Sequence, residues 1–129
     1  FEKLVFKPAP GTPRYDDFSG GKILRGTVTT EEGDTYTGDV RWDSDEAYSW
    51  EMLNGQSRDV TFRIELGMIK NISRNSYRES QVTLWDGRTF DLRGSNDVDE
   101  SNKGIIITQT GGKDVFVDWD EFKSLEFAK

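Results

Sequence analysis

The sequence predicts an all-β fold. The strand-forming residues Val, Ile, Thr, Phe, Tyr and Trp number 42 of the 129, whereas Ala, the strongest helix former, occurs three times. Apolar and polar residues alternate in several short runs, and pairs of turn-forming residues separate these runs. The chain is therefore expected to form short strands that are joined locally.

The expected strands follow from the two-residue period of a half-buried strand. The period is clearest over 36–42, 60–66 and 115–119, where every second residue is apolar or Gly. Tight turns are expected at four pairs that reach positive φ at low cost. These pairs are Glu32-Gly33, Asn54-Gly55, Asp86-Gly87 and Gly111-Gly112. Two non-alternating stretches, 66–68 and 120–122, predict one helical turn each, and a strand is expected after each of them.

The chain also contains an internal similarity. Residues 28–36 recur at 82–90, 54 positions later, and the acidic residues of 43–46 recur at 97–100 with the same shift. We interpret the pattern as a duplicated unit of strand, tight turn, strand, acidic loop, strand, tight turn, strand, helical turn and strand. The alternative is chance, since short β-hairpins resemble one another.

This succession of elements resembles that of the SH3-like and Sm-like small barrels. The most similar stretch is 82–90, an apolar strand that enters an Asp-Gly turn and leaves it again. The resemblance covers 22–129 and implies two tandem five-stranded barrels packed together, over 22–76 and 77–129. Sm-like proteins bind RNA, but their basic and base-stacking positions have no clear match here, so only the fold is carried over.

Residues 1–21 have a different composition. They contain all three prolines of the chain together with Gly11 and the pair Gly20-Gly21. This composition predicts an N-terminal extended arm that precedes the two barrels.

Composition excludes several classes of function. Without His or Cys the chain has no Ser-His-Asp machinery, no thiolate nucleophile and no zinc-thiolate site. The formal net charge of −7 disfavours nucleic-acid binding, which depends on Lys and Arg. No apolar run approaches the roughly 20 residues that cross a bilayer, so membrane insertion is not expected. Because the chain begins with Phe1, it is interpreted as a processed or excised product, and export to the periplasm or the extracellular space is favoured.

The two acidic loops are the first candidate site. Oxygen-bearing side chains at alternate positions suit Ca²⁺, which takes six to eight oxygen ligands. The candidate ligands are Asp97, Asp99, Ser101, Asp43, Asp45 and Glu46. The match to an EF-hand is partial, because Asn102 stands where Gly is expected and Thr108 stands where a bidentate Glu is expected. The alternatives are turn capping by the same side chains and a glycosidase-like pair of carboxyl groups.

Aromatic residues are the second candidate site. Trp42 and Trp119 lie on the apolar phase of their strands and are expected in the core. Trp85, Trp50 and Tyr48 lie in turns and loops, and are expected to form an exposed ligand-binding surface. Together these features predict a non-catalytic binding or interaction module, with an unidentified protein or glycan as partner. A calcium-stabilised domain and a carboxylate-dependent glycoside hydrolase are the alternatives.

Overall fold

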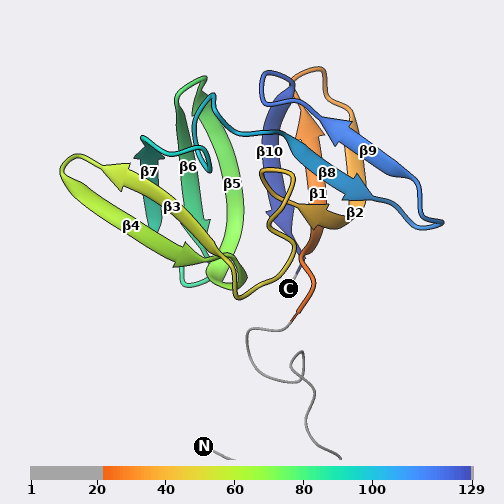
Figure 1. Ribbon diagram of the computed structural model, residues 1–129, viewed down its shortest axis with the longest axis horizontal. Coiled ribbons are helices and arrows are strands. Elements are labelled where there is room, and N and C mark those ends of the chain that lie inside the picture. The colour runs from red at the N-terminus through yellow and green to blue at the C-terminus, as the bar shows by residue number, and fades with distance from the viewer. Residues whose placement is uncertain (1–21, 129) are drawn as a thin grey trace, which may run out of the picture.

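The computed structural model describes residues 22–128, which form an all-β structure of ten strands and one short 3-10 helix (Figure 1). The predicted arm over 1–21 lies outside the described residues. The strands are β1 (Arg25–Thr30), β2 (Thr35–Arg41), β3 (Met52–Ser57), β4 (Val60–Glu65), β5 (Ile69–Ser76), β6 (Glu79–Leu84), β7 (Thr89–Arg93), β8 (Ile105–Thr108), β9 (Asp114–Val117) and β10 (Phe122–Phe127). The 3-10 helix, η2, covers Leu66–Met68, where a helical turn was expected. No helix in this part of the chain is long and apolar enough to cross a membrane.

The ten strands form one open antiparallel sheet in the order β4-β3-β7-β6-β5-β10-β1-β2-β8-β9. This order divides the sheet into two groups of five, which curl to either side of the central pair in Figure 1. The group β3 to β7 comes from one continuous stretch, 52–93, and is called the inner half. The group β1, β2, β8, β9 and β10 comes from both ends of the described chain and is called the outer half.

The expectation of two tandem barrels, each closed by its own contiguous part of the sequence, is not confirmed. Strands β1 and β2 pair with β10 and β8, whereas β6 and β7 pair with β5 and β3. The predicted boundary between 76 and 77 therefore falls within the β5–β6 hairpin of the inner half. The burial patterns of the third, fourth and fifth strands are alike in the two sequence units, so the sequence pattern alone does not specify which of the two sets the first two strands join.

Positions related by the sequence similarity take equivalent places in the two halves. Val28 pairs with Tyr36 in the β1–β2 hairpin, and Val82 pairs with Phe90 in the β6–β7 hairpin. The halves join where β5 pairs with β10, with Ile72 opposite Leu125 at the centre of three paired positions. Both side chains are fully buried, so the joint between the halves lies inside the core.

One hydrophobic core spans both halves. Its largest members are aromatic: Trp42 and Trp119 meet edge to face with ring centroids 6.1 Å apart, and Phe122 lies within 5.4 Å of both. The prediction that the two tryptophans belong to the core is confirmed. Trp119 also donates a hydrogen bond from Nε1 to the carbonyl oxygen of Tyr77, which links the outer half to the inner one.

The turn expected at Asn54-Gly55 is wrong. Both residues lie inside β3, where Gly55 is opposite Phe62 of β4. The chain reverses instead at Arg58 and Asp59, with Arg58 at φ 58°. A Cβ on Gly55 would press into the Leu92 side chain, so this glycine serves close packing between β3 and β7 rather than a turn.

Candidate functional site

The two acidic loops meet where the chain crosses between the halves. Residues 42–51 lead from β2 to β3, and residues 94–104 lead from β7 back to β8. Asp43 is 2% exposed and reaches the second loop with both carboxylate oxygens. Its Oδ1 accepts a hydrogen bond from the backbone N–H of Lys103 at 2.6 Å, and its Oδ2 accepts one from Asn96 Nδ2 at 2.5 Å. Asp43 therefore fixes one crossover to the other.

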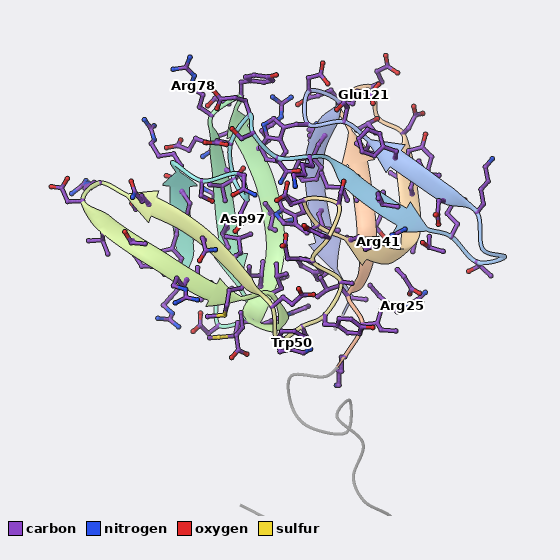
Figure 2. The ribbon with its side chains drawn as sticks, viewed as in Figure 1. Arg25, Arg41, Trp50, Arg78, Asp97 and Glu121 are labelled. Atoms are coloured by element: carbon purple, nitrogen blue, oxygen red, sulfur yellow. The ribbon has the colours of Figure 1, made fainter. Side chains whose placement is uncertain are left out.

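Asp97 makes the reciprocal connection from the second loop. Its carboxylate accepts a hydrogen bond from the backbone N–H of Asn54 in β3 at 2.7 Å. Its carbonyl oxygen accepts bonds from Trp42 Nε1 at 2.9 Å and from Asn102 Nδ2 at 3.2 Å. Figure 2 shows Asp97 in front of the strands of the inner half. The two aspartates, 54 positions apart in sequence, thus serve one polar network at the crossing.

Three carboxyl groups of the first loop converge at this crossing. Asp43, Asp45 and Glu46 each place one oxygen within 4.8 Å of an oxygen of the other two. Glu46 is held by its own backbone, which exchanges hydrogen bonds with Trp42. Its Oε1 atom is buried and has no hydrogen-bond partner in residues 22–128. A buried acceptor in this state costs free energy.

The pKa values of the cluster also indicate that its negative charges lack a positive partner. Burial, followed by the negative charges of Asp97, Asp45 and Asp43, raises the pKa of Glu46 to about 8. Burial also raises the pKa of Asp43 and of Asp97, against the hydrogen bonds that those groups accept. No Lys or Arg side chain ranks among the main influences on Glu46. The four carboxyl groups therefore favour any added positive charge.

The remaining predicted ligands lie apart from the cluster. Asp99 accepts a hydrogen bond from the backbone N–H of Ser101, which is the turn-capping geometry considered for these loops. Glu100 forms an ion pair with Arg78 at 3.4 Å. Sequence reasoning missed Asn96, whose amide completes the contacts of Asp43, and Asn54, whose backbone anchors Asp97. Neither contact follows from the sequence, because each depends on how the loops cross.

The predicted aromatic residues gather at one end of the molecule. Tyr48 and Trp50 stack with ring centroids 6.2 Å apart and planes 10° apart, and each is 41% exposed. Ser49, the residue between them in the sequence, lines a groove of about 400 Å³ together with Trp85 and Ile23. Sequence reasoning missed Ile23, which is 54% exposed and pairs with Tyr48 in an isolated bridge.

Comparison of the chain with protein-family models, characterised proteins and solved structures finds no match.

Proposed function

We propose that this chain is a non-catalytic binding module whose crossing acidic loops hold a divalent cation, with Ca²⁺ as the best match. The observation that carries the proposal is the buried Oε1 of Glu46, which has no hydrogen-bond partner within the described residues and lies among the carboxyl groups of Asp43, Asp45 and Asp97. Carboxylate oxygens are the ligands that Ca²⁺ prefers, and its coordination tolerates irregular geometry. A cation here removes the like-charge repulsion and supplies the missing partner.

The position of the cluster gives the cation a structural role. Asp43 and Asp97 each bond to backbone of a segment other than their own, Lys103 and Asn54 respectively. An ion bound beside them holds together both segments that cross between the halves. Because the unfolded chain does not keep these groups together, binding stabilises the folded form.

The same geometry argues against a carboxylate-dependent hydrolase. Asp43 and Asp97 are 2% and 5% exposed, so neither side chain is presented to a substrate. A glycosidase places its two carboxyl groups on opposite sides of the scissile bond, about 5 to 10 Å apart. Here one carboxylate oxygen each from Asp43, Asp45 and Glu46 lies within 4.8 Å of the other two. This arrangement supports ion binding rather than catalysis.

We retain two expectations as proposals. The resemblance to SH3-like or Sm-like barrels is supported by the equivalent strand order of the two halves and by η2 directly before β5. Export from the cell is the second expectation. It fits a Ca²⁺ site because extracellular calcium-binding modules have weak, millimolar affinities.

The test compares thermal unfolding in EDTA with unfolding in CaCl₂. A concentration a hundredfold above the dissociation constant stabilises the folded state by about 2.7 kcal/mol, which raises the melting temperature by several degrees. The variant Asp45→Asn removes one ligand without filling the core, and we expect it to lose most of this increase. Asp99→Asn, in the sister loop, is the matched control and keeps the increase. An equal melting temperature in EDTA and CaCl₂ for the unaltered chain contradicts the proposal.

A second candidate function is binding of a sugar ring or a peptide at the aromatic end. The stacked Tyr48–Trp50 pair favours it, because flat, amphipathic rings contribute large contact area at low entropic cost. A glycan and peptide array identifies the ligand. We then expect Trp50→Ala to weaken its binding at least tenfold, whereas Tyr77→Ala, which removes an exposed ring from the turn between β5 and β6, leaves binding unchanged. Equal binding by both variants removes this surface from consideration.

A further inference from the structure

A cavity of about 190 Å³ lies beside β9. One wall is the turn between β1 and β2, from Thr30 to Asp34, and another is the turn that precedes β10. The backbone N–H of Glu31 donates to the carbonyl oxygen of Glu121 at 2.9 Å, so the two walls are tied together. Figure 2 shows Glu121 at the upper rim of the outer half. The cavity is therefore a fixed feature of this edge.

The floor of the cavity is apolar. Tyr36 and Val115 are half-buried and Val117 is buried, and these three side chains share one face of the sheet, whereas Phe116 points to the opposite face. Such a floor favours aliphatic or aromatic side chains.

The rim of the cavity is acidic. Of the ten lining residues that belong to 22–128, half carry carboxyl groups and none is Lys or Arg. The carboxylates belong to Glu31, Glu32, Asp34, Asp120 and Glu121. Within residues 22–128, only Glu31 has a basic partner, Arg74, at 3.1 Å. The surface is thus complementary to a positively charged occupant.

The backbone of β9 is open on the same side. Among the strands of the described chain, 22–128, β9 is the last of the sheet and pairs only with β8. At the hairpin end, the N–H of Gln109 donates to the carbonyl oxygen of Lys113. From this hydrogen-bonded pair onward, non-hydrogen-bonded and hydrogen-bonded pairs alternate along β8 and β9. It follows that Asp114 and Phe116 direct their N–H and C=O groups away from β8. An exposed edge of this kind is a template for an added strand.

The inner half shows that the acidic rim is not required by the fold. Three acidic residues of the outer half have uncharged equivalents in the inner half. Trp85 takes the place of Glu31, Gly67 that of Asp120 and Met68 that of Glu121. Asp86 is equivalent to Glu32, but Arg88 pairs with it at 2.9 Å. Two halves of equivalent strand order therefore differ at this position, and only the outer one is acidic.

We propose that the β9 edge and its cavity bind an extended segment of a partner protein that carries Lys or Arg at alternate positions. The segment adds a strand to β9, its apolar side chains contact Tyr36 and Val115, and its cationic side chains meet the acidic rim. This interaction goes beyond the cation site and does not depend on it.

The probe is a fluorescein-labelled octapeptide of alternating Lys and Val, whose binding is followed by fluorescence anisotropy. The double variant Glu32→Gln/Asp120→Asn removes two rim charges whose carboxylates have no partner in the described chain. We expect about fivefold weaker binding, because each of these two exposed charges contributes only modestly to the attraction. The control Asp59→Asn/Glu65→Gln removes two exposed charges at β4, the opposite edge, and binding changes by less than twofold.

Three results overturn the proposal. If the control variant weakens binding as much as the rim variant, the peptide responds only to the overall charge of −7. If the peptide with Pro in place of every Val binds equally well, no strand is added, because Pro lacks the backbone N–H. If the unaltered chain does not bind the Lys-Val peptide, the edge does not accept a basic strand. Tight binding that the Pro peptide loses and the rim variant weakens supports the proposal.

Discussion

Glu46 is the residue of the acidic crossing that makes stability most sensitive to pH. Its pKa in the folded chain is about 8, against an ordinary value of 4.5. Between these two values the folded chain keeps a proton that the unfolded chain loses, so protonation favours folding. The resulting stability is complete below pH 4.5 and is lost as the pH rises towards 8. The raised pKa values of Asp43 and Asp97 act in the same direction from their ordinary value of 3.8.

We therefore predict that, in EDTA, the free energy of unfolding falls as the pH is raised from 5 to 8. Glu46→Gln removes the largest titrating group, so we expect a shallower dependence on pH and a more stable chain at pH 8. Urea unfolding at several pH values measures both quantities. Glu65→Gln is the control and should follow the unaltered chain. A stability that rises over this range, or a Glu46→Gln slope equal to that of the unaltered chain, would show that Glu46 holds no proton in the folded state.

At the scale of the element, the sequence predicts strands better than their partners. The alternation over 36–42 and 60–66 corresponds closely to β2 and β4, and Gly33 and Gly87 have the positive φ expected of their turns. The Asn54-Gly55 turn fails because a tertiary contact overrides local preference. Asn54 is held by Asp97 and Gly55 is needed beneath Leu92, which keeps both residues in the strand.

The candidate cation site was only partly predictable for the same reason. The sequence shows that two loops carry matching carboxylates. Of the predicted ligands, Asp43, Asp45 and Glu46 do lie together in the structure. The sequence does not show that Asp97 joins them from the second loop while Asp99 remains in a turn with Ser101. That selection depends on the direction in which each loop crosses, which is a property of the sheet and not of either loop.

At the scale of the whole molecule, the decisive feature is the exchange of strands between the two sequence units. The third to fifth strands of each unit present similar lengths and the same alternation, so the first two strands of each unit fit either set. Sequence patterns record which face of a strand is buried but not which strand lies beside it. The acidic loops become a shared site only because both of them cross between halves.

The exchange of strands between the two sequence units predicts which pairs of introduced cysteines can form a disulfide. Thr29 of β1 pairs with Ser124 of β10, and in a barrel closed by 22–76 alone its partner would be Asn71 of β5. Paired positions lie at the 4.4–6.8 Å Cα separation that a disulfide requires, whereas positions two strands apart lie near 10 Å. Because the chain has no cysteine, the double variants Thr29→Cys/Ser124→Cys and Thr29→Cys/Asn71→Cys are unambiguous. We expect the first to oxidise to a compact monomer of higher mobility in non-reducing electrophoresis, and the second to keep two free thiols. Cross-linking of the second pair and not the first would mean that each sequence unit closes on itself, and the two acidic loops would then have no reason to meet.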